Sequence, residues 1–240
     1  MLTKSDIKLI QSLSQKKFRE EQQLFVIEGE KIVGELMDSD FEIVRLFTTE
    51  AYEREHPKSE RISSAELNKI SHLKTPNRVL ALAKVKTDST ANYNWNEGYT
   101  LVLDGISDPG NLGTLIRIAD WFGIDKIVCS EDTVDVYNPK VVQATMGSMF
   151  RVSVAYTDLP TFLNKYREKI PVVGTLLNAK NINEVSISAP AFIVMGSESH
   201  GISKAVIKEL TESLSIPGKG RAESLNVGVA AGIVCAKLIK

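Results

Sequence analysis

Apolar runs and amphipathic segments alternate through residues 99–240, and this alternation limits the possible folds more than any other feature of the sequence. The short apolar runs predict strands, and the segments between them have the spacing of amphipathic helices. Strands that alternate with helices in this way form a mostly parallel sheet with helices on both faces. The expected strands lie at residues 100–103, 126–129, 151–155, 172–176, 191–194 and just before 217, and the expected helices at 112–122, 139–147, 159–169, 202–213 and after 224.

A second, smaller α/β pattern precedes this region. Its expected helices lie at residues 4–23 and 29–37, and its expected strands at 24–27, 43–47 and 79–83. Residues 86–98 are polar and rich in turn-forming residues, which is typical of a linker. We therefore predict an α/β protein with a small domain over residues 1–88, a linker over 89–98 and a larger domain over 99–240.

Composition excludes several classes of protein. The hydrophobic fraction of 43% and the charged fraction of 25% are ordinary for a soluble globular protein. No apolar run is long enough to span a membrane, and the first residues lack the apolar core of a signal peptide. The two cysteines lie far apart in the sequence, which fits a reducing compartment, and we expect a cytoplasmic protein. None of the three histidines lies near a cysteine in the sequence, so we expect no metal site.

The net charge of −1 gives no general argument for a nucleic-acid partner, so any RNA-binding surface must be a local patch. The candidate residues are Lys16, Lys17 and Arg19, which follow the first amphipathic segment, and Arg78, which precedes an expected strand. A cluster of this kind is either a phosphate-binding patch or an ordinary solvated face, and the sequence leaves both possibilities open.

The first of three polar segments in the larger domain runs from Leu103 to Asp120, where an expected strand turns into a helix. Open α/β sheets bind their ligands at such turns. Asn111 is a candidate helix cap, and Arg117 lies nearly two turns into the helix among apolar neighbours. The glycine fingerprint of dinucleotide-binding proteins is absent here, which disfavours a nicotinamide-dependent oxidoreductase.

The second segment, Phe192 to Ser203, also leads from an apolar strand into a polar turn bounded by glycines. A serine-hydrolase nucleophile needs a glycine two residues away on each side, and Ser199 has one only on its C-terminal side. The turn instead presents Glu198, a carboxylate at the end of a buried strand with no evident structural purpose.

The third segment, Ile216 to Val234, is a loop rich in glycine and polar residues that leads into an apolar helix. Ser224 or Asn226 is suited to begin this helix because either side chain accepts a hydrogen bond from a free backbone N–H. Gly228 and Gly232 lie within the helix, where each glycine costs about 1 kcal/mol relative to alanine. We therefore expect another segment to approach this backbone closely.

Together the three segments resemble the SpoU (TrmH-like) branch of the SPOUT RNA methyltransferases over residues 99–240. The motifs D-P-G-N-L-G-T-x-x-R, G-x-E-x-x-G and I-P-x-x-G-x-x-E-S-L-N-V occur in the family's order. The N-terminal region looks like the substrate-binding domain, similar to the ribosomal protein L30e/L7Ae fold, that precedes this catalytic domain in rRNA-modifying members. The resemblance implies a parallel sheet with a deep trefoil knot, a homodimer, and an S-adenosylmethionine-dependent enzyme that methylates a ribose 2′-hydroxyl of RNA.

The resemblance also implies roles for individual residues. Arg117 matches the catalytic arginine, and a set of polar residues matches the positions that support it: Asn111, Glu198, Ser224 and Asn226. The residues that match cofactor-binding positions are Leu176, Gly196, Ile216, Leu225 and Asn226. Arg117 either acts as a base or stabilises the developing alkoxide, and the second role suits a guanidinium that stays protonated at ordinary pH.

The substrate class is the main alternative that stays open. The N-terminal domain favours ribosomal RNA over transfer RNA. A non-catalytic RNA-binding or ribosome-assembly factor with the same fold is the other alternative, and the intact motif positions argue against it.

Overall fold

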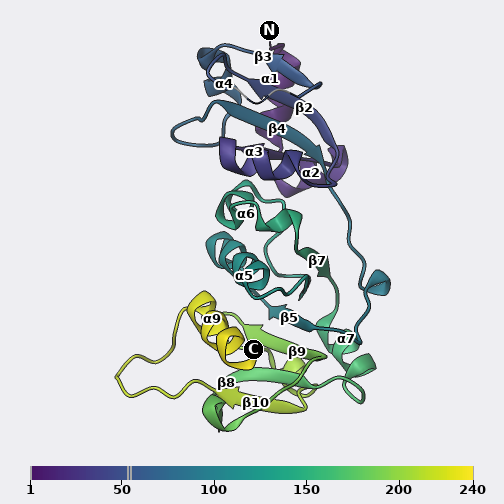
Figure 1. The fold of residues 1–240 in the computed structure, drawn as a ribbon, viewed down its shortest axis with the longest axis vertical. Coiled ribbons are helices and arrows are strands. Elements are labelled where there is room, and N and C mark those ends of the chain that lie inside the picture. Colours follow the sequence, from purple (N-terminus) through teal and green to yellow (C-terminus); the bar gives the residue numbers. More distant parts are fainter. Residues whose placement is uncertain (1, 53, 55, 240) are drawn as a thin grey trace. The chain divides into compact units, whose positions relative to one another are not determined.

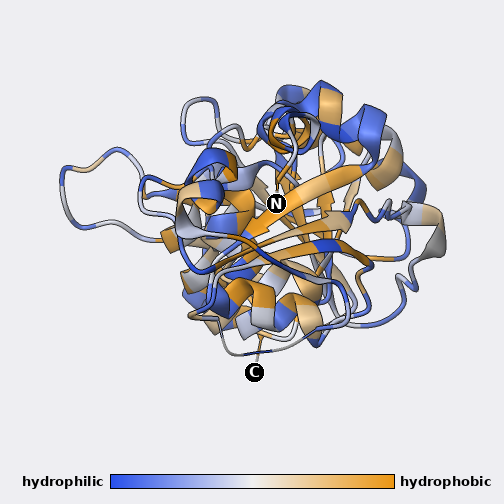
Figure 2. Ribbon diagram, turned by 90° about the horizontal axis from the view of Figure 1, so that it is seen from above, coloured by the Kyte–Doolittle hydropathy of each residue, from blue (hydrophilic) through white to orange (hydrophobic). Residues whose placement is uncertain are grey.

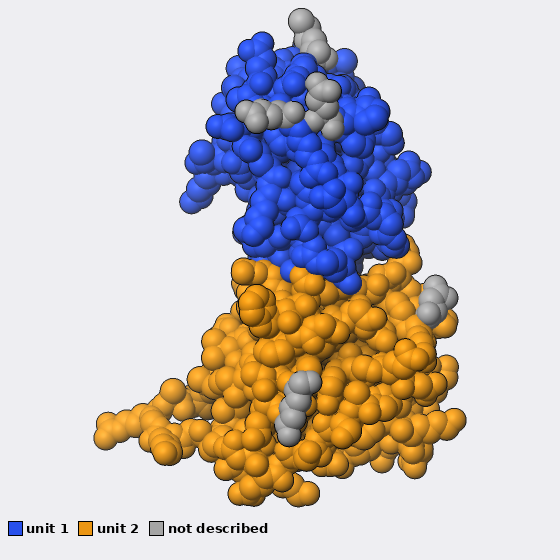
Figure 3. All heavy atoms as spheres, viewed as in Figure 1, with its two compact units in different colours: residues 1–86, 135–151 blue, residues 87–134, 152–240 orange. Residues whose placement is uncertain are grey.

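The computed structural model describes residues 2–52, 54 and 56–239. The chain divides into two compact units, residues 1–86 with 135–151 and residues 87–134 with 152–240 (Figure 3). Residues 135–151 therefore pack with the N-terminal residues, although the sequence pattern places them within the larger domain.

The first unit is built on a four-stranded sheet of order β1-β4-β2-β3. Strand β4 pairs antiparallel with β1 and β2, and β3 pairs parallel with β2. The strands are β1 Leu24–Glu28, β2 Ile43–Thr48, β3 Ser59–Arg61 and β4 Val79–Lys84. The helices are α1 Lys4–Ser12, α2 Lys16–Gln22, α3 Glu30–Met37, α4 Ser64–Ile70, α6 Pro139–Thr145 and the short 3₁₀ helix η2 Ser148–Phe150.

The expected helix over residues 4–23 is two helices, because the chain leaves helical geometry after Leu13. Helix α1 begins with a capping box in which Thr3 and Asp6 satisfy each other's backbone N–H groups. It buries Ile10, and Leu13 at its C-cap is buried as well. Both side chains belong to a core beneath the sheet that includes Phe47 of β2.

Residues 135–151 complete the other side of this unit. The expected helix in this segment is confirmed as α6. The ring of Tyr137 lies 4.6 Å from that of Phe25 in β1, and the ring of Phe150 lies 5.2 Å from that of Phe41. Gln143 also donates a hydrogen bond to the backbone oxygen of Glu28 at 3.0 Å. The segment therefore contributes aromatic side chains to the N-terminal fold.

The second unit contains a six-stranded sheet of order β10-β8-β9-β5-β6-β7, and every paired neighbour is parallel (Figure 1). The predicted parallel α/β architecture is confirmed. The strands are β5 Tyr99–Asp104, β6 Lys126–Cys129, β7 Ser153–Tyr156, β8 Val172–Asn181, β9 Ala191–Gly196 and β10 Glu212–Ser215. The helices are η1 Thr90–Asn92, α5 Pro109–Trp121, α7 Leu159–Tyr166, η3 Ile182–Glu184, α8 Lys204–Ile207 and α9 Val227–Leu238.

Most strands of these sheets are rich in hydrophobic residues, β3 and β10 being more polar, whereas several helices carry both polar and apolar residues (Figure 2). Within the described part of the chain, no helix combines the length and the apolar character needed to cross a membrane.

The expected linker contributes to the core of the second unit. Trp95 is buried at 7% exposure and packs edge-on against Phe162 and Phe192, with ring centroids 5.1 and 5.7 Å away. The buried Lys126 ammonium group donates to the backbone oxygen of Asn94 at 3.0 Å. The polar composition of this segment therefore did not indicate that Trp95 is part of the hydrophobic core.

The expected helix at residues 202–213 is wrong in its second half. Helix α8 ends at Ile207, and the chain continues into β10. Thr211 pairs with Val172 at the start of β8, where its backbone N–H donates to the Val172 oxygen at 2.9 Å. Parallel pairing with β8 therefore overrides the apolar spacing that suggested a longer helix.

Candidate functional site

Asn226 lies at the centre of a hydrogen-bonded cluster in the second unit. It is the N-cap of α9, and its side-chain oxygen accepts hydrogen bonds from the N–H groups of Gly228 and Val229 at 3.0 and 3.4 Å. Its side-chain amide donates to Asn111 Oδ1 at 2.9 Å and also to Glu198 Oε1. The predicted residues Asn111, Glu198 and Asn226 thus meet at one place.

Asn111 is positioned by the start of α5. Asp108 caps this helix and accepts a hydrogen bond from the Asn111 backbone N–H at 2.8 Å, and Pro109 occupies the first turn. Proline suits this position because its fixed φ angle fits a helix and its missing N–H would have no helical partner there. The Asp-Pro-Gly-Asn sequence therefore sets the direction in which the Asn111 side chain leaves the helix.

Glu198 is held by a tight turn between β9 and α8. The backbone groups of Ser197 and Gly201 form two hydrogen bonds of 3.1 and 2.9 Å across this turn. A Cβ atom at Gly196 would lie 2.1 Å from the carbonyl carbon of Gly201, so a side chain at position 196 would displace the turn. Glu198 Oε1 also accepts from the Val227 backbone N–H at 3.4 Å, which ties the turn to the start of α9.

Asp104, at the end of β5, binds the residue that follows the same turn. Asp104 is not among the candidate site residues that the sequence predicts. Its buried carboxylate accepts a hydrogen bond from the Ser203 N–H at 2.7 Å, just before α8. The available signal was an acidic residue that ends an apolar strand, which is the signal that singled out Glu198.

Helices α5 and α9 pack side by side behind the cluster. A Cβ atom at Gly228 would lie 2.9 Å from Thr114 Cγ2, and one at Gly232 would lie 4.0 Å from Ile118 Cδ1. Because both contacts advance by four residues, the two helices run parallel to each other. The expected close backbone approach is present at Gly228, and Gly232 has more room.

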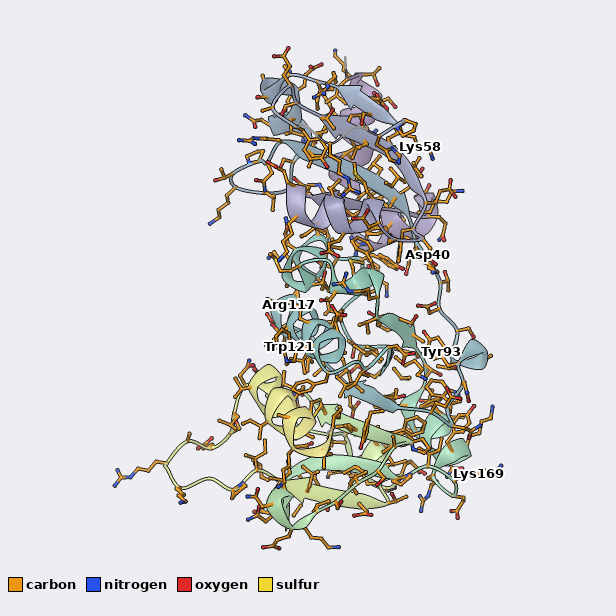
Figure 4. All side chains as sticks on the ribbon, in the orientation of Figure 1. Asp40, Lys58, Tyr93, Arg117, Trp121 and Lys169 are labelled. Carbon is orange, nitrogen blue, oxygen red and sulfur yellow. The ribbon has the colours of Figure 1, made fainter. Side chains whose placement is uncertain are left out.

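Arg117 lies on the exposed side of α5, and Trp121 follows it one turn later (Figure 4). Arg117 makes no hydrogen bond or ion pair with any residue that the structure describes. The structure therefore leaves its guanidinium open to solvent on the helix that also positions Asn111. Trp121 is 84% exposed.

Three of the predicted cofactor-binding residues lie in or directly after three neighbouring strands. Leu176 lies within β8, Gly196 ends β9, and Ile216 directly follows β10. Strand β8 pairs with both β9 and β10, so these positions belong to one half of the sheet. Leu225 is 46% exposed, and no hydrogen bond joins Ser224 to the cluster in the described structure, so the predicted place of Ser224 in the cluster stays a prediction.

A cavity of about 260 Å³ opens at the ends of β5, β6 and β7, and the hydrogen-bonded pair Asp104 and Ser203 is part of its lining. Its lining includes four carboxylates, Asp104, Glu131, Asp132 and Asp158, and none of the predicted cofactor-binding residues. A lining of this charge repels RNA phosphates. We therefore place the candidate site at the Asn226 cluster.

The predicted RNA-binding patch of the first unit needs one correction. Arg19 is only 3% exposed, and its guanidinium pairs with Asp135 at 2.5 Å and donates to the Leu13 backbone oxygen at 2.8 Å. It is a structural ion pair and is not available at the surface. Lys16 and Lys17 are exposed on α2, and Arg78 is exposed 3.5 Å from Glu30.

Comparison with known proteins gives a family match for the N-terminal region and another for the larger C-terminal region. Residues 98–236 match the SpoU rRNA Methylase family, and residues 4–81 match the MRM3-like substrate binding domain. The chain is 30% identical to the 23S rRNA (guanosine(2553)-2′-O)-methyltransferase RlmP of Bacillus subtilis, across 92% of this chain and 91% of that protein.

Two solved structures share the fold along nearly the whole chain. A TrmH-family protein from Porphyromonas gingivalis is 36% identical with a TM-score of 0.88, covering 99% of this chain and 98% of that one. An AdoMet-bound rRNA methyltransferase from Sinorhizobium meliloti is 29% identical with a TM-score of 0.88, covering 99% and 95%. With its parallel sheet and its three motifs in order, the chain belongs to the SpoU rRNA methylase family.

Proposed function

We propose that this chain transfers a methyl group from S-adenosylmethionine to a ribose 2′-hydroxyl of ribosomal RNA, with 23S rRNA as the substrate. The observation that carries the proposal is the cluster of Asn111, Glu198 and Asn226, which three elements far apart in the sequence bring together. The names of the RlmP relative and of the Sinorhizobium meliloti structure support the substrate class and the cofactor.

The residues in the middle of β8, at the end of β9 and just after β10 fit the cofactor. Leu177 is 74% exposed and Leu225 is 46% exposed, so apolar surface is available to cover an adenine ring. Leu176, Gly196, Ile216 and Leu225 are the residues that would hold the cofactor, and nearby main-chain groups would read its polar edges. When bound, S-adenosylmethionine supplies an electrophilic methyl group on a sulfonium centre.

Arg117 acts on the ribose in this proposal. A 2′-hydroxyl is a weak acid, so the negative charge that develops on its oxygen must be stabilised. A guanidinium stays protonated and offers several donors in a fixed plane, so Arg117 would hold this oxygen and an adjacent phosphate. Its exposure on α5 leaves it accessible to a large substrate.

The cluster positions this chemistry. Glu198 and Asn111 both accept hydrogen bonds from the side-chain amide of Asn226, so Asn226 orients both of them. Correct placement of two reacting atoms is a major part of the rate gain in a group transfer. We assign Asn111, Glu198 and Asn226 to positioning, with Ser224 as a further supporting residue on the same loop.

The active form in this proposal is a homodimer, with the C-terminal segment threaded into a trefoil knot. Trp121 of α5 is exposed next to Arg117, and Val229 and Ile233 of the neighbouring helix α9 are 52% and 39% exposed. Apolar side chains gathered on two adjacent helices suit a self-complementary interface. Light scattering on wild-type and Trp121→Glu protein tests this: the wild type is expected at twice the chain mass and the variant at the chain mass.

The function is tested with purified protein, methyl-labelled S-adenosylmethionine and unmodified transcripts of 23S rRNA and of transfer RNA. Nucleoside analysis of the 23S transcript is expected to show label on a 2′-O-methylated nucleoside. Label on a base, or label in the transfer RNA alone, would contradict the proposal. Failure to bind the cofactor in calorimetry would support a non-catalytic RNA-binding role.

A further inference from the structure

The loop between β10 and α9, residues 216–226, reaches away from the sheet of the second unit (Figure 1). Residues 217–225 are all exposed, and none of them makes a hydrogen bond or ion pair with any residue in the described part of the chain. Hydrogen bonds and ion pairs of the described residues therefore do not explain the length or the composition of the loop.

Both ends of the loop are nevertheless fixed. At the first end, Ser215 pairs with Asn181 of β8, and its hydroxyl donates to the Ala179 oxygen at 3.0 Å. At the second end, Asn226 is held by Asn111 and Glu198. The C-terminal end of the loop is thus part of the candidate site.

Two cations occupy the tip of the loop. Lys219 and Arg221 alternate with Gly218 and Gly220, and no atom lies within 4 Å of a Cβ placed at either glycine. The backbone is therefore free to adjust to a surface that it meets. Arg221 is five residues before Asn226, and five extended residues span about 17 Å, which sets the reach of the tip from the cluster.

Cations with these properties suit phosphate groups. Arginine binds phosphate through two parallel hydrogen bonds, and lysine binds it as a point charge. Neither side chain has a carboxylate partner in the described structure, so no internal ion pair has to be broken when a phosphate binds. Glu223 is the one acidic residue of the loop, which leaves its net charge at +1.

We propose that Lys219 and Arg221 bind phosphates of the RNA next to the methylated nucleotide, so that one loop contacts the cofactor at its base and the RNA at its tip. This inference rests on the proposed function. It assigns the RNA path near the active site to a segment that the overall charge of −1 does not reveal.

The test compares the wild type with Lys219→Ala/Arg221→Ala on an unmodified 23S rRNA transcript across a series of salt concentrations. Loss of two phosphate contacts is expected to weaken binding on the order of tenfold at low salt. It is also expected to reduce the salt slope, which is the steepness with which the logarithm of the binding constant falls with the logarithm of the salt concentration, by about 1.4. The charge-retaining variant Lys219→Arg/Arg221→Lys is expected to keep a slope near that of the wild type. Affinity for S-adenosylmethionine, measured by calorimetry, is expected to stay within about twofold because the cofactor lies at the base of the loop.

Lys165→Ala/Lys169→Ala is the matched control, because it removes two exposed positive charges, one in the last turn of α7 and one three residues after its end, on the side of the second unit away from the loop (Figure 1). Its salt slope is expected to equal that of the wild type. Equal slopes for the wild type and the loop variant would overturn the inference while leaving the proposed function intact. If the wild type itself fails to bind both the transcript and S-adenosylmethionine, the proposed function fails, and the inference fails with it.

Discussion

The side-chain amide of Asn226 donates a hydrogen bond to Asn111 Oδ1 at 2.9 Å, although 115 residues separate the two in sequence. The same amide bonds Glu198, so one N-cap residue joins the start of α9, the start of α5 and the turn after β9. The geometry of the candidate site therefore depends on the Asn226 amide, which donates hydrogen bonds to both Asn111 and Glu198.

Exchanging the donor and acceptor roles of Asn226 and Glu198 tests the cluster. Asn226→Asp keeps an oxygen to cap α9 but places a second carboxylate beside Glu198, where two like charges raise the pKa of one of them. We expect methyl transfer to fall, whereas helix α9 is expected to stay formed because aspartate retains the capping oxygen. Adding Glu198→Gln restores a donor–acceptor pair, and the double variant is expected to regain part of the activity. Activity lower than in both single variants would contradict the assigned contact.

Arg117→Ala is expected to reduce methyl transfer by at least about 100-fold, because it removes the charge that stabilises the 2′-oxygen. Cofactor affinity, measured by calorimetry, is expected to stay near the wild-type value. Arg117→Lys keeps the charge without the planar donors and is expected to recover little activity. An alanine variant that methylates at a comparable rate would show that Arg117 has been assigned wrongly.

Gly228→Ala is expected to destabilise the second unit. The new methyl group would lie 2.9 Å from Thr114 Cγ2, and such overpacking costs about 1–3 kcal/mol against a helix-propensity gain of about 1 kcal/mol. In a Thr114→Ser background the obstructing methyl is absent and Asn226 Oδ1, at 3.2 Å, is the remaining close atom, so the same change is expected to destabilise less. Urea unfolding of the four proteins gives the coupling energy. Gly232→Ala, with its nearest atom 4.0 Å away, is the control and is expected not to destabilise.

Arg19→Ala is expected to destabilise the first unit by about 3–5 kcal/mol, because it leaves Asp135 without its partner. Lys17→Ala, on the exposed side of the same helix, is expected to have almost no effect on the free energy of unfolding. At temperatures where the Arg19 variant is folded, its salt-dependent affinity for RNA is expected to match that of the wild type. A lower salt slope for the fully folded Arg19→Ala variant than for the wild type would show that Arg19 does contact RNA.

Acid sensitivity of the first unit is expected to involve Asp6. A hydrogen bond from Arg45, 2.5 Å away, is the main cause that lowers the pKa of Asp6 to about 2. Because the pKa of Asp6 is lower in the folded state than in the unfolded state, its charged form stabilises the fold at pH values above the unfolded pKa of about 3.8. That contribution disappears as the pH falls toward 2. Between pH 5 and pH 2, the urea midpoint of Asp6→Asn is expected to fall less than that of the wild type. Parallel curves for the two proteins would contradict this role.

The sequence could predict the parallel sheet and most of its helices because local periodicity follows from which faces are buried. It could not predict the end of α8, where pairing between β10 and β8 outweighs the apolar spacing. It also missed the burial of Trp95 in a polar segment and the packing of residues 135–151 with the N-terminal residues. These are long-range contacts, and no periodic pattern in the sequence encodes them.

For the candidate functional residues too, the sequence indicated the grouping of some and misjudged the environment of another. Motif order identified Asn111, Glu198 and Asn226, and the structure joins them by hydrogen bonds. Residue type alone placed Arg19 in a surface patch, and only its partner Asp135 shows that the guanidinium is buried. Charge counts along the chain cannot separate a buried ion pair from a phosphate-binding cation, because both begin as an arginine on an amphipathic helix.

The most direct test of the account is a map of ribose 2′-O-methylation on total RNA from cells with and without the gene. The account predicts that deletion removes methylation from 23S rRNA, and that the wild-type gene restores it while Arg117→Ala does not. An unchanged map after deletion, or a loss confined to transfer RNA, would contradict it.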